Sequence, residues 1–180
     1  MAMKRTVALI LAVIALTLAF SPEAYCAKKK KSRPKSSQPQ TQPVKKSDPH
    51  SYYRGLKPEQ AEQADNVARK IAEAVMSEKS LTSDLQRVKA AAVIVARYCS
   101  RCMYGNDPYK YYRSPYGVFV AGIFTCSGAT RALGRVLDFM GYKWEHANEN
   151  QYSHQWCILE MDGRKGFADG QLGAAGYGEY

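Results

Sequence analysis

The sequence predicts an α+β domain in which helices pack on an antiparallel sheet. Apolar residues recur at helical spacing over residues 58–76, 83–105 and 126–140. Residues 156–169 have the composition of two short strands joined by an Asp-Gly turn, which is typical of a β-hairpin. Three helices together with such a hairpin favour the α+β class.

The predicted helices carry recognisable end signals. A proline followed by an acidic residue suits the first turn of the helix over residues 58–76. Ser83 fits the start of a capping box, and the helix that follows should run to Gly105, with Met103 on its apolar face. Gly141 is the expected C-terminal cap of the third helix. The first two helices should pack as a pair.

Residues 1–27 have the pattern of a secretory signal peptide. Lys4 and Arg5 precede an apolar run from Val7 to Phe20, which is short for a membrane span of about 20 residues. Small residues follow, and cleavage is expected after Ala27. We therefore expect a secreted or cell-surface protein, with retention of the segment as an anchor as the alternative.

Residues 28–55 should form a disordered linker before a domain over residues 56–180. Residues 28–54 hold nine Lys or Arg against Asp48 alone and hardly any aliphatic side chain, so ordering them would gain little. The formal net charge of +10 therefore lies mostly on the linker. This distribution argues against a nucleic-acid partner and favours an anionic cell-wall polymer or membrane surface, with a plain solvated spacer as the alternative.

Cys126 lies where an apolar run gives way to small residues, at the predicted start of the third helix. The positive end of the helix dipole would stabilise a thiolate there, and the small residues 127–129 would leave space over the sulfur. The backbone N–H of Cys126 could donate to an oxyanion. Taken alone, however, Cys126 is better explained as a small buried core residue.

The hairpin register brings a histidine towards an aspartate. If Asp162-Gly163 is a two-residue turn, Asp169 lies opposite Trp156, and His154 is a diagonal neighbour of Asp169 on the same face. A loop one residue longer would put the two side chains on opposite faces. The sequence thus favours an imidazole oriented by a carboxylate, which suits a general base for a nearby nucleophile.

The stretches TCSGATRALGRVLDFMGY, SHQW and GFADG, in this order, resemble the transglutaminase-like superfamily of papain-related cysteine enzymes. The resemblance covers roughly residues 60–171. It implies a papain-like cysteine hydrolase core and a catalytic triad of Cys126, His154 and Asp169 that forms a thioester from a peptide or isopeptide amide. It also implies a peptidase more than a crosslinking acyltransferase, with no metal or organic cofactor. We expect a monomer acting on a peptide or protein substrate.

Two further residues are candidates for binding the substrate. Trp156 could line the cleft beside the catalytic histidine, or pack across the hairpin. Tyr116, in a Tyr-, Pro- and Gly-rich surface loop over residues 104–117, could supply a side-chain donor to the oxyanion. The family's usual residues after the cysteine's glycine are replaced here by Ala129 and Thr130, so substrate contacts do not carry across. A non-catalytic cell-wall- or protein-binding module that retains the fold is the alternative function.

The other cysteines after the signal segment are Cys99, Cys102 and Cys157. The first two form a CxxC inside a predicted helix, where buried thiols, or a disulfide between Cys102 and Cys157, are better supported than a redox motif. Zinc, bound by these three and a histidine, is a minor alternative. If Cys126 is a nucleophile, an odd number of cysteines remains, so at least one further thiol should be free or paired to another molecule.

Overall fold

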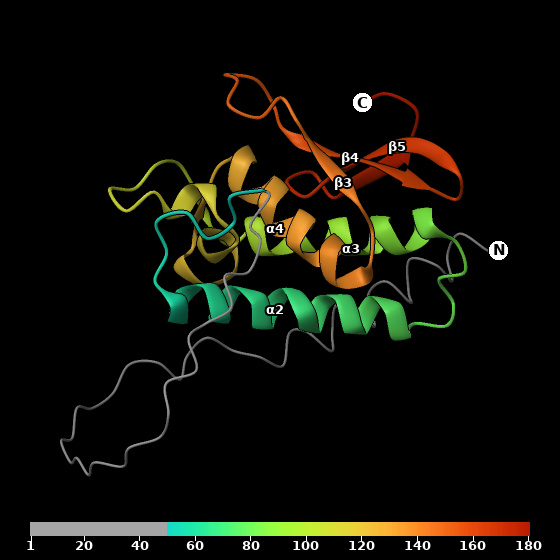
Figure 1. Cartoon of the computed structure of the whole chain (residues 1–180), viewed down its shortest axis with the longest axis horizontal. Coiled ribbons are helices and arrows are strands. Elements are labelled where there is room, and N and C mark those ends of the chain that lie inside the picture. Colours follow the sequence, from blue (N-terminus) through green and yellow to red (C-terminus); the bar gives the residue numbers. More distant parts are fainter. Residues whose placement is uncertain (1–49) are drawn as a thin grey trace, which may run out of the picture.

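The computed structural model describes residues 50–180 (Figure 1). In chain order the elements are α2 (Pro58–Ser77), α3 (Asp84–Cys99), β1 (Met103–Tyr104), the 3-10 turn η2 (Tyr111–Arg113), the π-helical turn η3 (Gly117–Ala121), β2 (Ile123–Phe124), α4 (Cys126–Met140), β3 (Trp144–Ala147), β4 (Trp156–Met161), β5 (Arg164–Asp169) and β6 (Ala174–Tyr177). This mixture of helices and sheet confirms the α+β class. The predicted signal peptide and most of the predicted linker lie outside the described residues. Within residues 50–180, no helix combines the length and the apolar character that crossing a membrane requires.

Helices α3 and α4 lie between α2 and a four-stranded antiparallel sheet of order β3-β4-β5-β6 (Figure 1). Helix α2 packs on both of the other helices, while α4 contacts β4 and α3 contacts β6. Because α4 is covered on two sides, ten of its fifteen residues are buried. The helix is packed in the core from Gly128 onward, and this packing fixes the position of the half-buried Cys126 at its start.

The helix end signals are partly confirmed. The Ser83 hydroxyl accepts from the backbone N–H of Gln86, and the Gln86 side chain accepts from the backbone N–H of Ser83, which completes the capping box. Gly141 caps α4 in the left-handed conformation, at φ 89°. Because a glycine pays no Cβ penalty there, α4 ends where the sequence predicts.

Helix α3 ends at Cys99, so the prediction that it runs to Gly105 is wrong. The chain turns over residues 100–102, and Met103 then pairs with Ile123 in the parallel β1–β2 ladder. The Met103 side chain is 68% exposed and does not belong to an apolar helix face. Helical spacing did not reveal this, because β1 is held by a partner twenty residues away in the sequence.

The hairpin has the predicted register. Met161 lies opposite Arg164, and the turn residues Asp162 and Gly163 have φ values of 52° and 71°. Two positive φ values are what a type I′ hairpin turn requires. The two-residue turn therefore sets which side chains of β4 and β5 share a face.

Residues 50–55 differ from the expected linker, because they pack on the domain. The Tyr52 side chain is 1% exposed, and its hydroxyl donates to Asp138 in α4 at 2.8 Å. Tyr53 donates to Asp65 in α2, and the His50 ring stacks on Trp144 at 3.9 Å between centroids. The sequence around these aromatic residues has few apolar side chains, and for this reason their packing on the domain was not predicted.

Candidate active site

Cys126 is the first residue of α4, and its position is set by the segment before the helix. Thr125 is the N-cap residue, and its backbone N–H donates to the carbonyl oxygen of Tyr112 at 3.0 Å. The half-buried Cys126 lies across from the β3–β4 loop, with its Sγ 3.9 Å from the carbonyl oxygen of Ser153. The thiol therefore lies at a helix N-terminus and beside the residue that precedes His154.

His154 and Asp169 are joined by a hydrogen bond of 2.5 Å between Nε2 and Oδ2. The buried Asp169 carboxylate also accepts from the backbone N–H groups of Gln171 and Leu172 at Oδ1, and from the Tyr180 hydroxyl at Oδ2. Because an ionised carboxylate can only accept, Nε2 of His154 is the donor. In the neutral imidazole this leaves Nδ1 free to take a proton.

Asp169 lies on a strand, whereas His154 lies at the end of a loop. Asp169 is the last residue of β5, whereas His154 precedes β4 and stands outside the ladder, which ends at the pair Cys157 and Ala168. The register of the hairpin sets the position of Asp169, and the end of the β3–β4 loop brings the imidazole to it. The Asn148 side chain holds this loop by donating to the carbonyl oxygen of His154 at 3.0 Å.

Cys126 and His154 line the same cleft, which has a volume of about 830 Å³. Its walls are the start of α4, Tyr104 of β1, the η2 segment and the loop over residues 150–155. Among residues 50–180, the lining of this cleft includes neither Trp156 nor Tyr116. This volume is within the range of small-molecule binding sites in proteins.

Trp156 lies beside the imidazole, outside the cleft lining. Its ring stacks near that of His154, with 6.2 Å between centroids, and on Tyr180 at 4.7 Å. Burial, followed by the hydrogen bond to Asp169, raises the pKa of Tyr180 to about 12, so its hydroxyl stays protonated and donates. Sequence reasoning missed Tyr180, because no local pattern indicates that the chain after β6 returns to Asp169.

Tyr104 is a second site residue that the sequence did not single out. Its side chain is 59% exposed and lines the cleft together with Cys126. Partial desolvation, followed by the proximity of Cys126, raises the pKa of its phenol. The β1–β2 pairing of Tyr104 with Phe124 sets this position. Tyr116, the sequence candidate for the same role, instead contacts the Tyr111 ring edge-on at 5.1 Å. The Tyr-rich loop over residues 104–117 indicated that a tyrosine contributes to the site, but it did not indicate which one.

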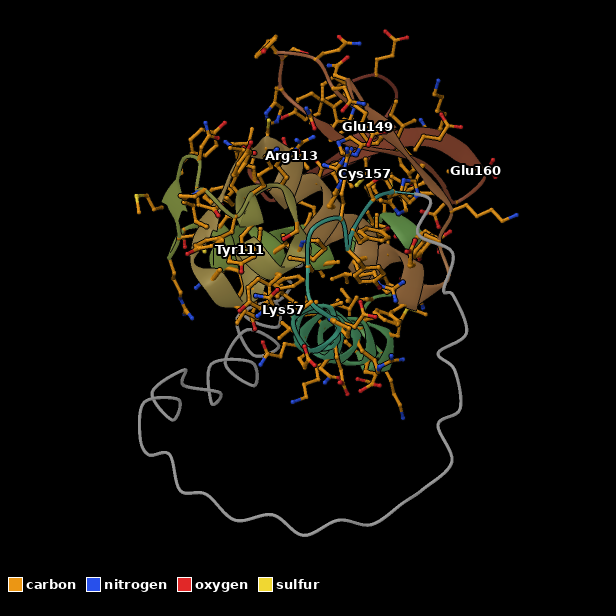
Figure 2. The ribbon with its side chains drawn as sticks, turned by 60° about the vertical axis from the view of Figure 1, so that its left-hand side comes forward. Lys57, Tyr111, Arg113, Glu149, Cys157 and Glu160 are labelled. Atoms are coloured by element: carbon orange, nitrogen blue, oxygen red, sulfur yellow. The ribbon has the colours of Figure 1, made fainter. Side chains whose placement is uncertain are left out.

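The other three cysteines are free thiols, and none lines the cleft within the described part of the chain. Cys157 is fully buried inside the molecule (Figure 2), and burial raises its pKa well above the usual range. Burial likewise raises the pKa of Cys99 to about 12 and that of Cys102 above its ordinary value. Cys102 and Cys157 are not joined by a disulfide, so that alternative is wrong.

The described residues offer no metal site, because no three His, Cys, Asp or Glu side chains converge within residues 50–180. Comparison with protein-family models, curated proteins and solved structures gave no significant match to this chain.

Proposed function

We propose that the chain is a cysteine hydrolase or acyltransferase with a transglutaminase-like, papain-related fold. It acts on peptide or isopeptide amides through a thioester, and transfers the acyl group more often to water than to an amine. One observation carries the proposal: His154, hydrogen-bonded to the buried Asp169, lines the same cleft as Cys126 at the start of α4.

In the proposed first half-reaction, Nδ1 of His154 takes the proton from Sγ of Cys126, and the sulfur attacks the carbonyl carbon of the amide. The imidazolium then gives this proton to the amide nitrogen, the C–N bond breaks and the amine leaves. Water or another amine attacks the thioester in the second half-reaction, and loses a proton to His154 as the thiol is released. Asp169 orients the imidazole throughout, because its carboxylate accepts from Nε2.

The oxyanion of the tetrahedral intermediate would be held at the start of α4. The backbone N–H of Cys126 is one donor, and we assign the second to the Tyr104 hydroxyl, because Tyr104 lines the same cleft as Cys126. The positive end of α4 favours negative charge at this point.

The proposed location rests on the sequence of residues 1–55. Export by the segment over residues 1–27 and attraction of the basic linker to an anionic wall or membrane surface would bring the enzyme to a wall-associated peptide or protein. Replacing residues 28–31 with neutral side chains should weaken retention on anionic cell walls at low salt. Unchanged retention would contradict this role of the linker.

Activity can be tested without knowing the natural substrate. A glutamine-containing peptide is incubated with a fluorescent primary amine, and released ammonia, released peptide and incorporated amine are measured separately. Cys126→Ala should abolish all three signals, whereas Cys102→Ala, at a half-buried thiol outside the cleft, should retain them. If the Cys126→Ala protein retains turnover, the proposal that the chain is an enzyme with Cys126 as nucleophile is wrong. If wild-type protein binds the peptide without turnover, the non-catalytic binding module is the better description.

A further inference from the structure

A second cavity, of about 310 Å³, adjoins the cleft and has four basic side chains in its wall. Arg54, Lys110, Arg113 and Arg131 contribute to its wall, against the single acid Glu149 within the part of the chain that the structure describes. These side chains come from four separate segments: residues 51–55 before α2, the residues around η2, helix α4 and the β3–β4 loop. We call this cavity the basic pocket.

Within residues 50–180, most of the positive charge in the basic pocket is not matched by an acidic side chain. The Arg131 side chain is 4% exposed and donates to the Glu149 carboxylate at 2.7 Å, so these two charges cancel. Across residues 50–180, the side chains of Arg54, Lys110 and Arg113 form no ion pair. Among the described residues, three positive charges of the pocket therefore have no acidic partner at ion-pair distance, and the Arg131–Glu149 pair is an example of a carboxylate held in its wall.

The walls of the basic pocket are built by unusual backbone conformations. Ser51, Lys110 and Asn150 have φ values of 55°, 62° and 64°, which residues with a side chain rarely adopt. The buried Arg131 ties the segments together, donating to the carbonyl oxygen of His50 at 2.7 Å as well as to Glu149. Conformations of this kind tend to occur where a ligand is bound.

The basic pocket is continuous with the catalytic cleft, because Arg113 and Asn150 line both. Figure 2 shows Arg113 and Glu149 near each other on neighbouring segments of the chain. We propose that the basic pocket binds a carboxylate of the substrate, on a residue next to the amide that Cys126 attacks. This assignment rests on the proposed function. It makes the substrate an acidic peptide, with Arg113 as the specificity-determining residue, because a guanidinium can donate two parallel hydrogen bonds to a carboxylate.

The test uses probes that differ only in charge. Chloroacetyl-Glu amide and chloroacetyl-Gln amide place the residue on the leaving-group side of the reactive carbon, and the chloromethyl ketones of acetyl-Glu and acetyl-Gln place it on the acyl side. Chloroacetyl-Gly, as free acid and as amide, tests a terminal carboxylate. Each probe alkylates the Cys126 sulfur with loss of chloride, and the inhibition constant KI reports binding while the maximal rate reports thiol reactivity.

At least one acidic probe should have a KI about tenfold lower than that of its neutral partner, at an equal maximal rate. The pair that shows the preference identifies the side and the kind of carboxylate. Arg113→Gln together with Lys110→Asn should abolish it, since asparagine tolerates the positive φ at residue 110. Arg113→Glu should favour the corresponding Lys probe. Lys79→Gln, which removes an exposed charge in the connection between α2 and α3, outside the lining of both cavities, should retain the wild-type preference.

Equal KI values in every pair, or a preference that survives the double substitution, would overturn the basic pocket as a carboxylate site. Failure of the proposed function has a different signature, in which no probe alkylates Cys126 faster than a model thiol. In that case, carboxylate binding by the basic pocket is tested separately. The Cys126→Ala protein is titrated with acetyl-Glu amide and with acetyl-Gln amide, and binding is followed by NMR. Selective shifts from the acidic compound, lost in the double variant, support the pocket, and their absence refutes it.

Discussion

The Nε2 atom of His154 lies 2.5 Å from Oδ2 of the buried Asp169 carboxylate. In Asp169→Asn, the new amide N–H would face Nε2, so the neutral imidazole would have to carry its proton on Nδ1, where it cannot serve as the base. We expect kcat to fall about 10³-fold or more with the substrate KM little changed. Steady-state kinetics on protein of verified fold measure this, and a loss smaller than about tenfold would contradict the orienting role of Asp169.

Tyr104→Phe tests the proposed oxyanion donor. Removing the Tyr104 hydroxyl from the cleft that Cys126 lines should lower kcat about 10²-fold, because the donor acts mainly on the charge that develops in the transition state. Tyr116→Phe is the matched control and should keep wild-type kcat, since Tyr116 lies outside the cleft lining. If Tyr116→Phe lowers kcat more than Tyr104→Phe does, Tyr116 is the better candidate for the oxyanion donor.

Gly128→Ala tests how the η2 segment is held against α4. A Cβ at residue 128 would lie 2.3 Å from the carbonyl oxygen of Tyr112, so η2 or the helix must move. Alanine is the better helix former by about 1 kcal/mol, yet we expect the free energy of unfolding to fall by about 1–3 kcal/mol, because the clash is with backbone.

Gly105→Ala is the control for this substitution, since a Cβ there meets no atom within 4 Å. It should leave the midpoint of urea unfolding within experimental error. A Gly128→Ala protein as stable as the wild type, with unchanged activity, would show that the contact between η2 and α4 is loose.

His146 makes the stability depend on pH. Burial and the nearby Arg131, with a smaller contribution from His50, lower its pKa from about 6.5 to about 4, against the opposing effects of Gln155 and Glu149. Between these values the unfolded chain binds a proton that the folded chain does not, so stability falls as the pH drops from 6.5 towards 4. We expect a loss on the order of 2 kcal/mol from this group.

The measurement is the free energy of unfolding at pH 7 and pH 5 for wild type and His146→Gln. The substitution should reduce the difference between the two pH values, because glutamine does not titrate in this range. A difference of unchanged size would assign the acid sensitivity to other groups.

The parts of the fold that depend on local sequence were predictable. The capping box at Ser83, the end of α4 at Gly141 and the hairpin register all follow from residues within a few positions of one another. The approach of Asp169 to His154 follows from that register together with a loop conformation that the sequence does not specify.

The missed features all depend on contacts between distant segments. The end of α3 depends on a strand pair with residues near Ile123, and the burial of Tyr52 depends on Asp138 in α4. Tyr104 reaches Cys126 through the same strand pair, and Tyr180 reaches Asp169 only after β6 has added to the sheet. Propensity and spacing do not encode such partners, because the free energy that selects them comes from tertiary packing.

Timed alkylation of the native protein with iodoacetamide at neutral pH, mapped by mass spectrometry, measures the reactivity of all four thiols of residues 50–180. Cys126 should be modified first, at least about tenfold faster than a model thiol, and more slowly in His154→Ala. Cys99, Cys102 and Cys157 should resist until the protein unfolds, because burial raises the pKa of each. A Cys126 that reacts no faster than the model thiol, or that is recovered in a disulfide, would contradict its role as the nucleophile.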